Sequence, residues 1–172
     1  NLIGNMIKRI YGFEKHKENQ DSNNQYYITI NGVTYLVTNT EFNDNFEMIT
    51  THDNKIFVRG SNDNGQLGIP GVEDINNYTE LNIPDINIKN NTCGDTHSLL
   101  LDEQNILYGT GSNKHGQLLN LPDGINEFTQ LETDVKYACA TRNLTIIKKN
   151  NIIYVAGETI GNKFVPYTFK SQ

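Results

Sequence analysis

The side chains in this sequence best suited to covalent chemistry are Cys93 and His97, which lie close together in the segment CGDTHSLLL. A thiolate beside an imidazole is the arrangement of nucleophile and base found in cysteine hydrolases. The same segment recurs upstream in a weaker form, with Phe42 and Phe46 at the two positions. Positions that accept aromatic side chains are packing positions, so we expect His97 to be buried and hydrogen-bonded rather than catalytic.

No motif in the sequence meets the requirements of a metal or cofactor site. The segment NDNG at 62–65 has the composition of a calcium loop, but the first and twelfth ligand positions would be Gly60 and Gly71, which carry no side-chain oxygen. The segment GTG at 109–111 lacks the third glycine and the following helix of a dinucleotide-binding fingerprint. We therefore expect no cofactor, and the lack of a catalytic constellation favours a non-enzymatic role.

These candidate residues belong to an internal repeat. The segment IFVRGSNDNGQLG, which begins at Ile56, aligns with LYGTGSNKHGQLL, which begins at Leu107. Fainter copies begin at Ile10 and Ile153. One aromatic residue in each copy marks the register, and the four are spaced 46, 51 and 46 residues apart: Tyr11, Phe57, Tyr108 and Tyr154. A period of this length predicts a stack of similar structural units.

A second motif supports the alignment, because it lies 15 residues before each of the last three aromatics. Its clear copy begins at Cys93 and a degraded copy begins at Cys139, which aligns Asn143 with His97. We predict a single domain, 1–172, built from units at approximately 11–56, 57–107 and 108–153 and a partial unit at 154–172.

The pattern within each unit is typical of strands joined by turns, because short apolar segments alternate with Gly, Asn and Asp. A unit of this size cannot bury both faces alone and must stack on its neighbours. The sequence therefore predicts an all-β fold, a partial β-propeller of about 3.5 blades. The residues expected in the interior are Ile56, Leu99, Leu100, Leu107, Ile146 and Ile153.

The repeat also predicts structural roles inside the loop after each repeated strand. Glycines would end a strand or adopt positive φ, and asparagines would bond to backbone amides. Glutamines would satisfy loop carbonyls, and leucines would anchor the loop to the core. In the first copy these residues are Gly60, Gly65, Asn62, Gln66 and Leu67. In the second copy they are Gly111, Gly116, Asn113, Gln117 and Leu118. The structural positions outside these loops are Cys93, Gly94, His97 and Gly157.

The motif GSNxxGQL at 60–67 and 111–118, combined with CGxxHSL at 93–99, resembles the signature of the regulator of chromosome condensation repeat family. The resemblance implies a seven-bladed β-propeller, of which this chain would hold a little over three repeats. An incomplete stack leaves two hydrophobic faces and several strand edges in water. We expect the rest of a propeller, in the same or another chain, to cover them.

Family members resembling this sequence share a disc that binds proteins, so the resemblance implies a protein–protein interaction module or scaffold. One alternative is a guanine-nucleotide exchange factor for a Ran-like small GTPase. The inserted residues around 69–74 are too few for the wedge hairpin by which such factors displace nucleotide. A second alternative is a structural subunit of a larger assembly.

Charge narrows the choice of partner. The formal net charge of −6 argues against a DNA-binding surface and favours a basic protein partner. The candidate interaction loops are acidic and contain Glu73, Asp74, Asp102 and Glu103. No apolar run approaches the ~20 residues that span a membrane. Two cysteines are too few for a disulfide framework, which favours an intracellular location, cytoplasmic or nuclear.

Overall fold

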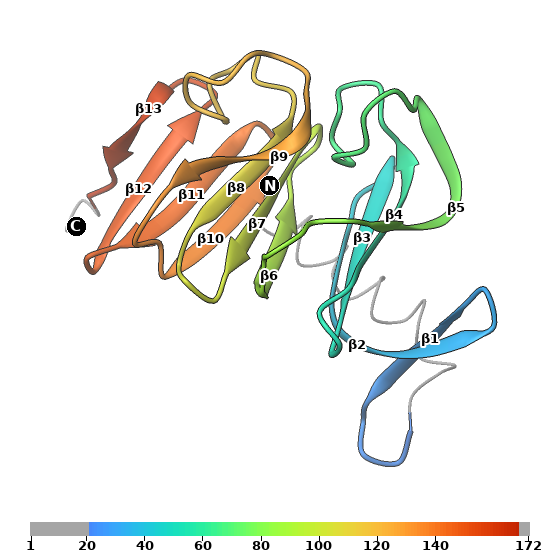
Figure 1. Ribbon diagram of the computed structural model, residues 1–172. Helices are drawn as coiled ribbons and strands as arrows, with labels where there is room; N and C mark the ends of the chain where they lie inside the picture. Colours follow the sequence, from blue (N-terminus) through green and yellow to red (C-terminus); the bar gives the residue numbers. More distant parts are fainter. Residues whose placement is uncertain (1–20, 169–172) are drawn as a thin grey trace.

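The computed structural model describes residues 21–168, in which thirteen strands form three antiparallel sheets without a helix (Figure 1). The predicted repeat start at Tyr11 lies outside the described residues. The first sheet contains β1 (Tyr26–Ile30), β2 (Val33–Phe42), β3 (Phe46–Thr51), β4 (Ile56–Ser61) and β5 (Asp74–Leu81). The second contains β6 (Ile88–Cys93), β7 (His97–Asp102), β8 (Leu107–Gly111) and β9 (Ile125–Glu132). The third contains β10 (Tyr137–Thr141), β11 (Leu144–Lys149), β12 (Ile152–Gly157) and β13 (Gly161–Pro166).

Asparagine makes the tight turns of these sheets. Each sheet is a meander in which sequence neighbours pair, so the chain must reverse direction within a few residues. Asn54 lies in the β3–β4 turn with a φ of 63°, and Asn105 has the same φ in the β7–β8 turn. Asparagine tolerates this left-handed conformation better than other residues with a Cβ atom. Positive φ recurs at Asn24, Asn31, Asn150 and Asn151, so short reversals account for part of the asparagine content of the chain.

The sheets stack face to face as the blades of a partial β-propeller. Each sheet has a forward face, directed at the following sheet, and a rear face, directed at the preceding one. The forward face of the second sheet packs Leu99, Leu101 and Leu107 against Ile147 of the third. The forward face of the first sheet likewise packs Met48 and neighbouring residues against the second sheet. The all-β propeller predicted from the repeat is confirmed.

The rear face of the first sheet is covered by the chain itself. Figure 1 shows the β1–β2 hairpin projecting beyond the first sheet. Ile28 and Ile30 of β1 pack with Tyr35 of β2 against Ile49 and Phe57, which lie on that rear face. The expectation of two bare faces was therefore wrong for this end of the stack. The hairpin takes the place that the apolar face of a preceding sheet would occupy.

The interior residues follow the alternation of the strands, with two corrections. Ile56, Leu99, Leu100 and Leu107 are buried, but Ile146 and Ile153 are only half-buried. Both belong to the forward face of the third sheet, on which no further described sheet packs. Ile147, the next residue along β11, points into the core instead.

Candidate functional site

Loops interlock the stacked sheets. After β4, the segment around Gly65 and Gln66 reaches the rear face of the second sheet. The Ser98 hydroxyl donates to the Gln66 carbonyl at 2.6 Å, and the Thr110 hydroxyl donates to the Gly65 carbonyl at 2.7 Å. The approach is close, since a Cβ atom on Gly65 would lie 2.5 Å from the Ile125 carbonyl oxygen. The loop thus holds one sheet against the next through its own backbone.

The side chains of this loop bond mainly to the loop itself. Gly65 has the expected positive φ, 78°. Asn62 accepts from the Leu67 amide at 2.9 Å and donates to the carbonyls of Ile69 and Val72, which matches the predicted Asx role. Gln66 differs from the prediction, because its Oε1 accepts from the Asn64 amide and so satisfies a donor rather than a carbonyl. Leu67 is fully buried in the core between the first two sheets.

The second loop repeats the arrangement one sheet further along. Asn113 accepts from the Leu118 amide at 2.8 Å, and Gln117 Oε1 accepts from the His115 amide at 3.0 Å. The Thr145 hydroxyl of the third sheet donates to the Gln117 carbonyl at 2.7 Å. Gly116 has a φ of 83° and lies against the backbone of β13. The corresponding connection after β12 is only the short turn 158–160 and offers no loop to a following sheet.

His97 is a packing residue. It is fully buried, and its Nε2 lies 3.1 Å from the Thr145 hydroxyl. Because that hydroxyl already donates to the Gln117 carbonyl, Nε2 carries the proton and donates to it. Nδ1 lies against Gly94, where an added Cβ would meet it at 2.6 Å. Burial lowers the pKa of His97 from 6.5 to about 4, so the imidazole is neutral at physiological pH.

The alignment of the third repeat with the second slips by one residue. His97 pairs with Gly111 in the ladder, and the residue that pairs with Gly157 at the same place is Leu144. Leu144, not Asn143, is therefore the counterpart of His97, and Ala140 replaces Cys139 as the counterpart of Cys93. The cause is the β11–β12 turn, which spans 150–151 and is shorter than the β7–β8 turn. Motif spacing cannot reveal where within a repeat a residue is missing.

Three glycines at or next to the ends of β4, β8 and β12 share one conformation. Gly60, Gly111 and Gly157 have φ values of 109°, 111° and 117°. A Cβ atom on any of them would lie within 2.5 Å of a carbonyl oxygen at the neighbouring turn, on Asn45, Thr96 and Asn143 respectively. Glycine is thus required at these positions by both space and backbone conformation.

The forward face of the third sheet is an open apolar surface. Ladder pairing places Cys139, Ile146, Val155 and Val165 in one row across all four strands. Cys139 is exposed, Val165 is 46% exposed, and the other two are half-buried. Leu99, the counterpart of Ile146 in the second sheet, is fully buried. A bare apolar face was expected at each end of an incomplete stack, but Ile146 and Ile153 were expected in the interior and not on that face. The short connection after Gly157 was the sequence signal for its position.

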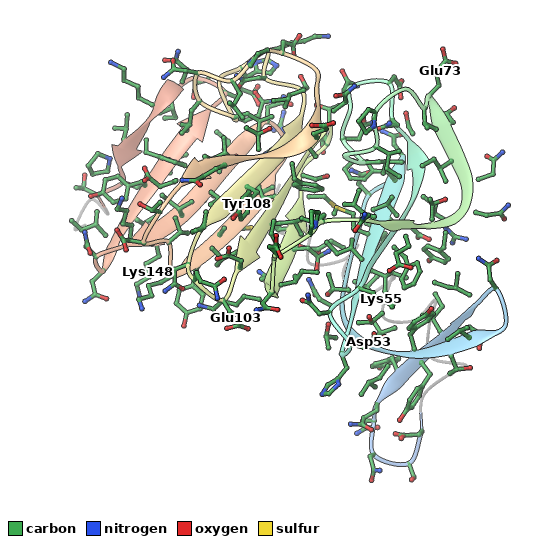
Figure 2. The ribbon with its side chains drawn as sticks, viewed as in Figure 1. Asp53, Lys55, Glu73, Glu103, Tyr108 and Lys148 are labelled. Atoms are coloured by element: carbon green, nitrogen blue, oxygen red, sulfur yellow. The ribbon has the colours of Figure 1, made fainter. Side chains whose placement is uncertain are left out.

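The four acidic candidates do not form one site. Glu73 and Asp74 are exposed beside the first interlocking loop, and Glu103 is exposed in the β7–β8 turn. Figure 2 shows Glu73 and Glu103 at opposite rims of the stack. Asp102 is buried, where it accepts from the Ile106 amide at 2.8 Å and from the Tyr108 hydroxyl at 3.3 Å. The prediction of Asp102 as an interaction residue was therefore wrong, because its carboxylate is committed to the turn.

Other site chemistry is lacking in the part of the chain that the structure describes. Residues 21–168 contain no group of three or more His, Cys, Asp or Glu side chains placed to hold a metal ion. Within the same residues there is no helix of the length and hydrophobicity needed to cross a membrane.

Comparison with known proteins agrees with this geometry. The regulator of chromosome condensation (RCC1) repeat matches residues 92–117. An RCC1 repeat-containing protein of Schizosaccharomyces pombe is 44% identical over 59 residues, which cover 34% of this chain and 16% of that protein. The human X-linked retinitis pigmentosa GTPase regulator is 34% identical over 76 residues, which cover 44% of this chain and 8% of the regulator. The matched regions are thus a small part of each relative.

Solved structures show the same architecture. Yeast RCC1 (Prp20), determined bound to Kap60, superposes with a TM-score of 0.63 and 23% identity over 70% of this chain and 32% of its own. The stacked sheets and their interlocking loops define a partial β-propeller. This fold is the one seen in yeast RCC1, and residues 92–117 match the regulator of chromosome condensation repeat.

Proposed function

We propose that the chain is a protein–protein interaction module that binds through the forward face of its third sheet. The occupant we propose is a further sheet of the same repeat type, in the same or another polypeptide. One observation carries this proposal. Leu99 and Leu107 of the second sheet are buried because a following sheet covers them. Their counterparts in the third sheet, Ile146 and Ile153, are also aliphatic, although no further described sheet covers them. Contiguous exposed apolar surface of this kind marks interaction sites.

Polar groups at the edge of the same face support this occupant. In the first sheet, Asn54 Oδ1 accepts from the Ile88 amide at 2.7 Å where the chain enters the second sheet. In the second sheet, the Asn105 carbonyl accepts from the Val135 amide at 2.9 Å where the chain enters the third. Asn151 occupies the equivalent turn of the third sheet and is exposed. The face thus offers both the apolar surface and the turn used twice within the chain.

The proposal is tested by crosslinking from the exposed Cys139 thiol, which lies on this face in the edge strand β10. A photoactivatable maleimide on Cys139 should capture the partner in extracts, and the captured peptides should come from a protein with the same repeats. The V155D variant should abolish capture, since a carboxylate buried in an apolar interface is costly. A C139S/E103C variant moves the probe to the exposed β7–β8 turn as a matched control. Equal capture from both positions, or capture that survives V155D, would refute the proposal.

Guanine-nucleotide exchange is a second candidate function, and one observation favours it: a matched relative is a GTPase regulator. The assay measures release of labelled GDP from a Ran-like small GTPase. If substoichiometric amounts of the chain accelerate this release, exchange activity replaces the interaction module as the proposed function. A role as structural subunit of a larger assembly is tested by light scattering, where a well-behaved monomer would argue against it. Intracellular location remains a prediction.

A further inference from the structure

A charged residue interrupts the apolar forward face of the third sheet. Ladder pairing places Tyr137, Lys148 and Ile153 in one row on this face. The Lys148 ammonium lies 5.8 Å from the centre of the Tyr137 ring, and Tyr137 is 67% exposed. Among the described residues Lys148 has no ion-pair partner, whereas Lys149, on the rear face, is paired with Glu132 at 3.1 Å.

The same position is buried in the other two sheets. Thr50 of the first sheet and Leu101 of the second stand where Lys148 stands in the third. Thr50 is 3% exposed and Leu101 is 2% exposed, because a following sheet packs on each of them. A sheet that packs on the third sheet would likewise remove water from the Lys148 ammonium. Burial of an ammonium is costly unless the charge is paired and hydrogen-bonded.

Two donors on the forward face of the first sheet share one acceptor on the second sheet. The Thr50 hydroxyl donates to Asn91 Oδ1 at 3.3 Å, and Asn39 Nδ2 donates to the same atom at 2.7 Å. Tyr137 and Lys148 are paired in the third sheet as Asn39 and Thr50 are paired in the first. Both carry donors, a phenol hydroxyl and an ammonium. An acceptor at the place of Asn91 would therefore serve both.

The contact between the second and third sheets is apolar at this place. Leu101 belongs to the same apolar cluster as Ala138 of the third sheet. Ala138 is the counterpart of Asn91, because it pairs with Ile147 as Asn91 pairs with Leu100. The following sheet thus carries an acceptor where the forward face presents donors, and an apolar residue where it presents leucine.

We propose that the sheet covering the third sheet carries Asp or Glu at the position equivalent to Ala138. This assignment rests on the function proposed above and adds the chemistry of the occupant. The carboxylate accepts from the Tyr137 hydroxyl and the Lys148 ammonium and replaces the water that the ammonium loses. The three described sheets carry Thr40, Asn91 and Ala138 at this position, none of them acidic. The position therefore favours a different sheet over these three sheets of a second copy.

The test uses an extended chain, in which residues 1–168 are followed by a second copy of residues 133–168 as a fourth sheet. The junction keeps the register, because ladder pairing makes position 166 of β13 equivalent to position 130 of β9. The added copy carries C139S, and its Ala138 is either kept or changed by A138D. The alkylation rate of the original Cys139, followed by peptide mass spectrometry, measures coverage of the face. The counterpart of Cys139 in the second sheet, Thr92, is 2% exposed under its covering sheet.

A138D in the added sheet should slow alkylation of Cys139 about tenfold relative to the unchanged copy. K148M in the original third sheet should reverse this order, because the carboxylate is then buried without a partner charge. Y137F should reduce the advantage of A138D about threefold, since one donor is lost. K149M is the matched control, because Lys149 lies on the rear face, and it should leave the tenfold ratio unchanged.

Equal rates with and without A138D, or an advantage of A138D that persists with K148M, would overturn the assignment of an acidic residue. Slower alkylation in the extended chain than in the natural chain would still support the proposed function in that case. Alkylation as fast in every extended chain as in the natural chain would refute both proposals. The protein captured from Cys139 gives a second measurement, because a captured repeat protein without Asp or Glu at the aligned position would overturn this assignment alone.

Discussion

Protonation of His97 should make the stability of the protein depend on pH. Burial lowers the pKa of the folded-state imidazole to about 4, whereas the unfolded chain titrates near 6.5. Between these values the unfolded state binds the proton and the folded state does not, so acid favours unfolding. The stabilisation is fully present above pH 6.5 and is lost as the pH falls toward 4.

The magnitude follows from these two pKa values. Lowering the pH from about 7.5 to about 5 should reduce the free energy of unfolding by about 2 kcal/mol through His97 alone. Urea unfolding followed by circular dichroism at the two pH values measures this loss. Carboxylates with ordinary pKa values contribute little to the change in stability above pH 5. Comparison with a variant that lacks only the imidazole cancels whatever they do contribute.

The H97L variant is that control, because Leu144 occupies the same position in the third sheet. It loses the hydrogen bond to Thr145 and should be less stable than the wild type at neutral pH. Its stability should nevertheless fall by about 2 kcal/mol less than that of the wild type over the same pH interval. Equal losses in the two proteins would show that the imidazole is not held neutral in the folded state.

Three further predictions concern packing and backbone. L99A should lower the free energy of unfolding by about 2 to 5 kcal/mol. I146A, at the equivalent but uncovered position, should lower it by less than about 1.5 kcal/mol. Denaturant unfolding of both variants measures the difference. G65A should destabilise by more than about 1 kcal/mol, since its Cβ would meet the Ile125 carbonyl and its φ is 78°, and a thermal midpoint equal to that of the wild type would contradict this. D102N should lower the thermal midpoint and E103Q should leave it unchanged, because only Asp102 accepts bonds within the turn.

Local chemistry predicted the repeated loop well. The positive φ of Gly65 and the bonds of Asn62 depend on residues a few positions away, and such relations are visible in a linear sequence. The exposure of Ile146 cannot be predicted from neighbouring residues, because it depends on whether another sheet packs on the third sheet. The same limit applies to Glu47 and Arg59, whose pairing across β3 and β4 gave no signal in a motif search.

The cover that the β1–β2 hairpin provides has a consequence for polymerisation. A stack of repeated sheets with two bare ends could join end to end without limit, because a heterologous contact that does not close forms a filament. In this chain, the forward face of one copy would meet the hairpin of the next copy and not a bare sheet. Head-to-tail growth by the sheet-on-sheet contact is therefore blocked at the rear face, which protects the molecule against fibre formation.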